Sequence, residues 1–365
     1  MSNSDAFITP ETYLKRQSAE LESSEGKLLI ACLQPAKYLA DEVVRIYRDR
    51  LRKENSAADL IYLDDIEKQF SDGETCIELS HNVRGSDVFL FQSLFSPSSG
   101  FDVNHNYLSF YIACRTFREH GAKTITGVLP YLAYARQDKP TKFKREPTTA
   151  RLMADLSISA GLDRLTAWDP HSSQIRGFYG TKTLVMLEPL SFLLNYFTAF
   201  EGKDDVIAVS PDAGGAKLVT HFARAMNIQS AVASKFRPHP EAVEISEIIG
   251  NFTGKKSAVI LDDMIGSAGT VQAVSKILAR EKGIEAIYLA ASHNLCSDKA
   301  YEKLIEMHEQ YNLQHVYVTD SIPQQKRFTD LPFFTVYSIA SDLALTINRI
   351  HFNSSVSEVF YNPPE

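Results

Sequence analysis

The sequence predicts an α/β fold of two similar domains, each with a mostly parallel sheet flanked by helices. From about residue 27 onward, short apolar runs rich in Val, Ile and Leu alternate with longer amphipathic stretches. This alternation is typical of parallel strands whose two faces are both covered by helices. An order of strand, polar loop and helix occurs in both halves, and 365 residues are enough for two domains.

Each segment that we expect to form a strand is a short apolar run with polar or turn residues at its ends. The expected strands are residues 28–33, 87–93, 124–131, 164–169, 205–211, 257–263, 286–293 and 315–320. The segments between them have helical periodicity, and several end at Gly, as helices commonly do. The expected helices are residues 107–121, 148–161, 190–197, 214–227 and 270–283.

We expect a polar N-terminal extension over residues 1–26, a first domain over 27–187 and a second over 188–365. The boundary is placed at Glu188-Pro189, after an apolar run and before a helix-like segment. This domain assignment leaves open that the last residues pack back on the first domain. In open α/β sheets ligands bind at the carboxyl ends of the strands, so the loops that follow the strands are where chemistry is expected.

The formal net charge of −7 disfavours a nucleic-acid-binding protein, since that class is usually basic. No apolar run approaches the roughly 18 residues of a membrane span, and the N-terminus lacks the apolar core of a signal peptide. The four cysteines lie far apart without CxxC pairing. We therefore expect a cytoplasmic protein with reduced thiols and no membrane partner.

The most informative motif is AVILDDMIGSAGT, residues 258–270. A buried strand ends in Asp262 and Asp263, and a loop of small residues then leads into a helix. Successive N–H groups at such a loop and helix start can hold a phosphate, while the two carboxylates suit sugar hydroxyls, directly or through a divalent cation. The alternative is a simple tight turn with a helix N-cap, which the paired aspartates disfavour.

Three further loops follow expected strands. In VSPDAGGAK, residues 209–217, Asp212 among small residues suits a diphosphate and a metal, or the segment is only a turn. In YARQDKP, Arg136 and Gln137 can hold a polyphosphate, unless the basic stretch is merely solvated. In DPHSSQIRGF, His171 follows a strand end and is either a metal ligand or base, or a structural histidine.

Two more segments carry residues of interest. SKFRPHP places Lys235 and Arg237 on one side of an extended segment, where two cations can stabilise charge on a transferring phosphoryl group. The alternative is ordinary surface charge. KQFSDGE, residues 68–74, reads as a turn before the strand TCIEL and indicates little by itself.

Together these segments resemble the ribose-phosphate diphosphokinase family, which makes phosphoribosyl pyrophosphate (PRPP). The resemblance lies in FSDGE, YARQD, DPHSSQIRGF, SPDAGG, KFRP and the DDM…GT loop, which occur in the family's order from about Lys27 to His351. It implies two phosphoribosyltransferase-type domains and the transfer of the β,γ-diphosphoryl group of Mg-ATP to the 1-hydroxyl of ribose 5-phosphate. It also implies Mg²⁺ as cofactor and a homo-oligomer in which neighbouring subunits share the adenine site.

The resemblance implies a role for each matching residue. The catalytic pair is Lys235 and Arg237, and the magnesium ligands are His171 and Asp212. The ATP-binding residues are Phe70, Asp72, Gly73, Glu74, Arg136 and Gln137. The ribose 5-phosphate-binding residues are Arg237, Asp262, Asp263, Gly266, Ser267, Ala268, Gly269 and Thr270.

The chain departs from the family's usual pattern in its sugar-phosphate loop and in its catalytic segment. The loop usually reads DDMIDTAGT, and here Gly266 and Ser267 replace its Asp-Thr, so one carboxylate near the ribose is lost. The catalytic segment usually reads KRR, and here Phe236 stands between the two cations. The extension and the stretch after YARQD also differ. In the family this neighbourhood helps to bind phosphate and ADP as regulators, so the resemblance does not extend to that regulation.

Two alternative functions share part of this pattern. A phosphoribosyltransferase that consumes PRPP has the DDM…GT loop but needs neither RQD, FSDGE nor the DPH segment. A non-catalytic regulatory homologue of a PRPP synthase complex is expected to lose the catalytic cations or the metal histidine. Lys235, Arg237 and His171 are all retained, which favours the enzyme.

Overall fold

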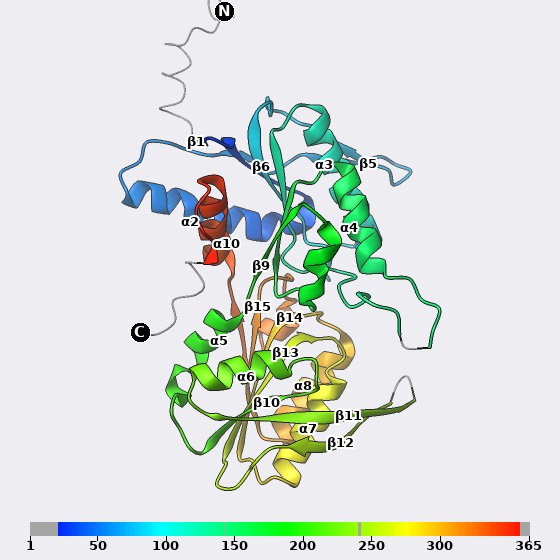
Figure 1. Cartoon of the computed structure of the whole chain (residues 1–365), viewed down its shortest axis with the longest axis vertical. Helices are drawn as coiled ribbons and strands as arrows, with labels where there is room; N and C mark the ends of the chain where they lie inside the picture. The colour runs from blue at the N-terminus through cyan, green and yellow to red at the C-terminus, as the bar shows by residue number, and fades with distance from the viewer. Residues whose placement is uncertain (1–20, 142, 240–241, 358–365) are drawn as a thin grey trace, which may run out of the picture. The chain divides into compact units, whose positions relative to one another are not determined.

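The computed structural model describes residues 21–141, 143–239 and 242–357, and for residues 235–239 and 242–246 it describes the backbone only. Contacts divide the chain into two compact units (Figure 1). The first unit runs up to Leu187 and resumes at Ile339, and the second is Glu188–Ser338. The expected extension falls largely on residues 1–20, which lie outside the description.

The first unit is built on a seven-stranded sheet with the order β1-β2-β6-β7-β8-β9, in which β3 also pairs with β2. All its pairings are parallel except that of β1 with β2. A separate hairpin consists of β4 and β5. The strands are β1 (Glu22–Ser23), β2 (Gly26–Cys32), β3 (Ile61–Leu63), β4 (Glu67–Gln69), β5 (Thr75–Ile77), β6 (Ser86–Phe91), β7 (Thr124–Val128), β8 (Arg164–Trp168) and β9 (Thr183–Leu187).

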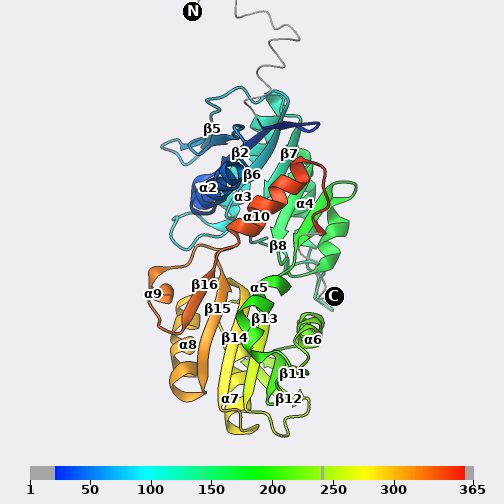
Figure 2. The ribbon, with the colours of Figure 1, turned by 90° about the vertical axis from the view of Figure 1, so that its left-hand side faces the viewer.

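Helices cover both faces of this sheet, with α2 and α10 on one side and α3 and α4 on the other (Figures 1 and 2). Burial on both faces explains why β6 ends in an apolar run, with Val88, Phe89, Leu90 and Phe91 all fully buried. The helices are α2 (Lys37–Lys53), α3 (Val103–Glu119), α4 (Thr149–Ala160) and α10 (Ala340–His351), with short 3₁₀ turns at Gln34–Ala36 and Ser173–Tyr179.

The second unit has a seven-stranded sheet of order β12-β11-β10-β13-β14-β15-β16, parallel except where β12 pairs with β11. Its strands are β10 (Val206–Ser210), β11 (Gln229–His239), β12 (Ala242–Ile249), β13 (Ser257–Ile265), β14 (Ala286–Asn294), β15 (Leu313–Thr319) and β16 (Phe334–Tyr337). Its helices are α5 (Leu190–Phe197), α6 (Ala216–Ala225), α7 (Gly269–Arg280), α8 (Asp298–Gln310) and α9 (Lys326–Thr329), with a 3₁₀ turn at Thr198–Phe200.

The helix α7 is fixed on this sheet by an apolar stripe. Val271, Val274 and Leu278 are spaced by three and four residues, so they share one face of the helix, and all three are buried. They join a core cluster with Ile260 of β13 and Leu304 of α8. Each such side chain contributes about 1.5–3 kcal/mol by its burial, which holds the first turn of α7 in place at the end of β13.

The predicted α/β class and the expected strands and helices are confirmed, with ends shifted by a few residues. The expected strand 257–263 corresponds to β13, and the expected helix 270–283 corresponds to α7. Gly161 ends α4 in the left-handed conformation, with a φ of 114°, as its position in the sequence indicates.

The four cysteines are free thiols, and burial raises the pKa of Cys32 to about 12 and that of Cys296 to about 11. Within the described ranges, no helix has the length and apolar character needed to cross a bilayer.

A buried hydrogen bond connects the C-terminal helix α10 to the sheet of the first unit. The Nδ1 atom of His351 lies 2.9 Å from Oδ2 of Asp87, and both side chains are fully buried. Arg164 approaches the other oxygen of Asp87 at 3.3 Å. The hydrogen bond therefore joins α10 to β6 across a very long stretch of sequence.

We predict that His351→Ala lowers the free energy of unfolding of the first unit by about 3 kcal/mol, because it leaves a cavity and removes one partner of a buried carboxylate. Urea unfolding measures the change, with exposed His81→Ala as the matched control. A loss below about 1 kcal/mol would show that Arg164 alone satisfies Asp87.

Candidate functional site

The end of β13 carries the paired carboxylates. Strand β13 lies in the middle of its sheet, between β10 and β14. Asp262 and Asp263 are both half-buried, and the backbone N–H of Asp263 donates to Oδ1 of Asp262 at 2.9 Å. Burial raises the pKa of Asp262 well above its ordinary value, and the negative charges of Asp263 and Asp212 raise it further.

The segment after these carboxylates forms a tight loop at the start of α7. Ala268 adopts the left-handed conformation, with a φ of 56°, and is the N-cap residue of the helix. The hydroxyl of Ser297 donates to the carbonyl of Gly266 at 2.7 Å and fixes the loop. The first N–H groups of a helix have no partner within the helix and carry partial positive charge. The loop is therefore suited to an anion such as a phosphate.

The neighbouring strand β10 brings Asp212 to the same edge of the sheet. Parallel pairing sets Val209 opposite Ile260, so both strands end at this edge. Oδ1 of Asp212 accepts from the N–H of Gly214 at 2.9 Å. A β-carbon on Gly215 would lie only 2.8 Å from Oγ of Ser210, so a larger residue would displace the hydroxyl that donates to the carbonyl of Asp212.

The structure therefore brings together Asp212, Asp262, Asp263 and the loop from Gly266 to Thr270, as their positions after neighbouring strands predict. Searched over its described residues, the chain contains no cluster of three or more His, Cys, Asp or Glu side chains that could hold a metal ion. A divalent cation held here would need oxygens from a substrate to complete its coordination. Mg²⁺ is commonly bound in this way, by one or two carboxylates, water and phosphate.

Lys235 and Arg237 both lie on β11, which pairs with β12 in an antiparallel hairpin. The pairing is irregular between Ser234 and Lys235 and again after Phe236. The side chains of the two cations lie outside the described part of the molecule.

In the first unit, FSDGE forms the turn between β4 and β5. The N–H of Phe70 donates to the carbonyl of Glu74 at 2.9 Å, and the N–H of Glu74 donates to Oδ1 of Asp72 at 3.1 Å. Gly73 has a φ of 96°, which a larger residue would adopt only with strain. The ring of Phe70 is 59% exposed, so this turn presents an aromatic face and a carboxylate to the solvent.

Arg136 and His171 belong to loops that follow the adjacent parallel strands β7 and β8. Both side chains are exposed. Gln137 is held in place, since its Oε1 accepts from the hydroxyl of Thr149 at 2.6 Å and its carbonyl from the N–H of Ala150 at 3.2 Å. These bonds fix the loop against the start of α4.

Asp138 and Gln174 are positioning residues that the sequence analysis missed. The amide of Gln174 donates to the buried carboxylate of Asp138, which joins the RQD loop to the DPHSSQ loop. Both residues lie within the motifs quoted above, but only the fold shows that they are partners. Their bond ties together the two loops just after Arg136 and His171.

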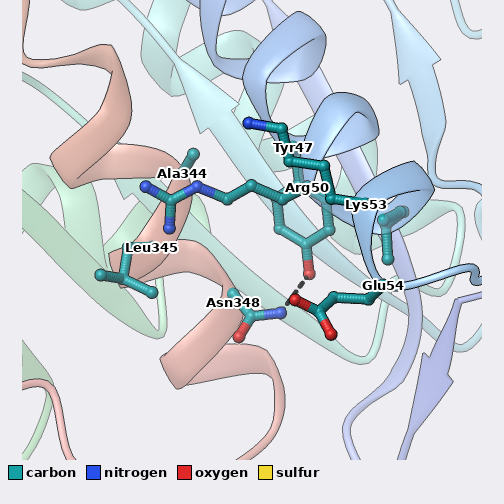
Figure 3. Close-up of a pocket in the computed structure, with 8 residues that line it drawn as sticks. Tyr47, Arg50, Lys53, Glu54, Ala344, Leu345 and Asn348 are labelled. Carbon is teal, nitrogen blue, oxygen red and sulfur yellow. Dashed lines mark hydrogen bonds between the residues drawn. The ribbon is translucent and has the colours of Figure 1, made fainter.

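A separate pocket of about 410 Å³ lies between α2 and α10 (Figure 3). It is lined by residues that include Arg50, Lys53 and Leu345, and Asn348 donates to the hydroxyl of Tyr47 at 2.8 Å on its wall. None of the predicted site residues lines it. The strand-end loops, and not this pocket, contain the predicted chemistry.

Fold and site together define an α/β protein of the kind that binds phosphorylated ligands at strand-end loops. Family models extend this description. Residues 28–161 match the N-terminal domain of ribose phosphate pyrophosphokinase, and residues 208–361 match the phosphoribosyl synthetase-associated domain.

Proteins of known family are similar to this one in sequence or structure along most of the chain. A ribose-phosphate pyrophosphokinase of Fusobacterium nucleatum is 37% identical over 297 residues, which are 80% of this chain and 89% of that protein. Ribose-phosphate pyrophosphokinase 1 of Listeria monocytogenes is 33% identical and covers 93% of this chain and 99% of its own. The crystal structure of phosphoribosylpyrophosphate synthetase from Mycobacterium smegmatis aligns with a TM-score of 0.76, at 29% identity, covering 90% of this chain and 99% of that one.

The chain belongs to the ribose-phosphate pyrophosphokinase family. The predicted family and enzyme class are thereby confirmed, and neither the regulatory homologue nor the PRPP-consuming transferase is favoured.

We predict that Asp262→Asn makes the ligand-free protein more stable at pH 8. The folded state raises the pKa of Asp262, so it binds the proton more tightly than the unfolded chain does. This contribution is complete below the unfolded pKa, near 4, and is lost as the pH rises through the folded value. The neutral amide should therefore raise Tm at pH 8, and the difference should shrink toward pH 5.

Thermal unfolding across this pH range, without Mg²⁺, measures the effect. Asp204→Asn, at an exposed carboxylate of the same unit, is the control and should show no pH-dependent difference. Equal pH profiles for wild type and Asp262→Asn would contradict a raised pKa of Asp262 in the folded protein.

Proposed function

We propose that this chain transfers the β,γ-diphosphoryl group of Mg-ATP to the 1-hydroxyl of ribose 5-phosphate, giving PRPP and AMP. Membership of the ribose-phosphate pyrophosphokinase family supports the reaction. The observation that carries the proposal is the end of β13, where two carboxylates stand directly before an anion-binding loop. A phosphorylated sugar has the matching chemistry, with hydroxyls beside one phosphate.

The sugar phosphate would occupy this strand end. Its 5-phosphate accepts hydrogen bonds from the backbone of the loop Gly266–Thr270, while the carboxylates of Asp262 and Asp263 accept from ribose hydroxyls. Glycine at position 266 leaves the backbone donors of the loop intact. Arg237 is proposed to contact the same substrate.

Mg²⁺ fits the residues present, because Asp212, Asp262 and Asp263 are oxygen donors. Burial raises the pKa of Asp262, and the negative charges of Asp263 and Asp212 raise it further, so a cation here would relieve that cost. We assign His171 and Asp212 as its protein ligands, with phosphate oxygens of ATP as the others. When bound, the ion neutralises charge that develops on the phosphates. The protein's own part is to hold the hydroxyl and the phosphorus in line.

ATP would be held by two groups of residues in the first unit. Arg136 and Gln137 are proposed to bind the nucleotide and its phosphates. The exposed turn with Phe70, Asp72, Gly73 and Glu74 is proposed to contact the adenine of an ATP molecule that is bound to a neighbouring subunit of a homo-oligomer. An exposed aromatic ring with a nearby carboxylate suits stacking and hydrogen bonding to a purine.

Lys235 and Arg237 are proposed as the catalytic residues. Two cations near the transferring group would stabilise the negative charge that grows on its oxygens in the transition state. Their position on one strand, two residues apart, is compatible with acting as a pair. We also propose that the enzyme works in the cytoplasm, which the four free cysteines support.

Incubation of the protein with Mg-ATP and ribose 5-phosphate tests the proposal, with AMP and PRPP followed by chromatography. AMP should appear in equal amount to PRPP, and only when the sugar phosphate is present. Release of ADP, or AMP formation without the sugar, would contradict a diphosphoryl transfer to ribose 5-phosphate.

We predict that Lys235→Ala lowers kcat by two or more orders of magnitude and changes the KM for ATP little, because the cation acts mainly in the transition state. Steady-state kinetics measures the split, with the exposed Lys256→Ala as control. Near-normal PRPP formation by Lys235→Ala would remove this residue from the catalytic pair.

A further inference from the structure

A lysine from α8 reaches the proposed sugar-phosphate loop. Helices α7 and α8 pack side by side in the second unit (Figure 1). A β-carbon placed on Gly269 would lie 3.2 Å from Nζ of Lys303 and 3.6 Å from Oγ of Ser267. The ammonium group of Lys303 therefore stands beside the first residue of α7, although the two residues are far apart in sequence.

This ammonium group has no competing partner in the described ranges of the chain, where Lys303 forms neither an ion pair nor a hydrogen bond. Two acidic side chains of α8 have other partners. Glu306 accepts from Gln272 at 2.7 Å and from the hydroxyl of Tyr311 at 3.2 Å. Asp298, at the start of α8, pairs with Arg327 at 2.6 Å. A half-buried cation without a carboxylate is suited to a ligand's negative charge.

The loop itself needs such a charge. Residues 266–270 are Gly, Ser, Ala, Gly and Thr, so they offer only neutral donors. Asp262 and Asp263 stand directly before them, and their carboxylates repel an anionic ligand. A phosphate monoester carries close to two negative charges at neutral pH. Neutral N–H donors and one helix terminus compensate this charge only in part.

Gly269 also has a reason to be glycine at this point. A β-carbon there would lie 3.2 Å from Nζ of Lys303, so a larger residue would displace the ammonium by a few tenths of an ångström. Without a side chain at this position, Nζ of Lys303 stays close to the first residue of α7.

We infer that Lys303 is a further binding residue for the 5-phosphate of ribose 5-phosphate, and that it supplies the positive charge that the loop lacks. This inference rests on the proposed function. Lys303 would make the enzyme selective for a phosphorylated sugar over the free sugar, because only the phosphorylated sugar has a group that contacts its ammonium.

The test compares Lys303→Met, which keeps the length of the side chain and removes its charge, with Lys303→Arg, which keeps the charge. Lys299→Met, at an exposed position on the same helix, is the matched control. Calorimetry measures the Kd of each protein for ribose 5-phosphate and for ribose. Steady-state kinetics measures KM and kcat for both substrates.

Lys303→Met should weaken ribose 5-phosphate binding by about 10- to 100-fold, as expected for one charge-assisted hydrogen bond. The KM for ribose 5-phosphate should rise by a similar factor, while the KM for ATP and kcat stay within about twofold. Lys303→Arg should recover most of the affinity, and Lys299→Met should behave as wild type.

Wild-type affinity in Lys303→Met would overturn the inference, as would an equal loss for ATP and ribose 5-phosphate or a fall in kcat alone. A different result would contradict the proposed function: wild-type protein that forms no PRPP from Mg-ATP and ribose 5-phosphate. In that case the calorimetric comparison still decides whether Lys303 meets the phosphate.

Discussion

The site is governed by the electrostatic cost of placing Asp262 and Asp263 side by side in a half-buried position, with Asp212 nearby. Burial and the neighbouring charges raise the pKa of Asp262, so the ligand-free protein holds unfavourable charge at this edge. Hydroxyl groups and a divalent cation relieve that repulsion, whereas an isolated phosphate would increase it. The arrangement is therefore matched to a ligand that presents hydroxyls and metal-bound oxygens to the carboxylates and its phosphate to the next loop.

The fold supplies this arrangement through the sheet and the helices that cover it. Parallel pairing of β10 with β13 brings Asp212 and the carboxylate pair to one edge. The buried stripe of α7 holds the helix start at the end of β13, and Ser297 fixes the loop through the carbonyl of Gly266. Rigid elements thus position groups that would repel one another in a flexible chain.

Much of this could be predicted from sequence, because buried parallel strands such as β6 and β13 each contain a run of apolar residues. The paired aspartates that follow the apolar run of β13 mark the ligand-binding edge. Long-range contacts could not be predicted in this way. The pairing of Asp138 with Gln174, the packing of α10 on α2, and the approach of Lys303 to Gly269 all depend on tertiary structure. Helical periodicity shows that α8 has an apolar face, but it does not show which loop Lys303 approaches.

The most direct measurement of the central claim is the change in backbone amide NMR shifts on adding ribose 5-phosphate, with ribose as the comparison. The account predicts that the amides of Gly269 and Thr270 shift strongly with ribose 5-phosphate and far less with ribose, because the phosphate contacts the start of α7. Shifts confined to other parts of the chain, such as the pocket between α2 and α10, would contradict it.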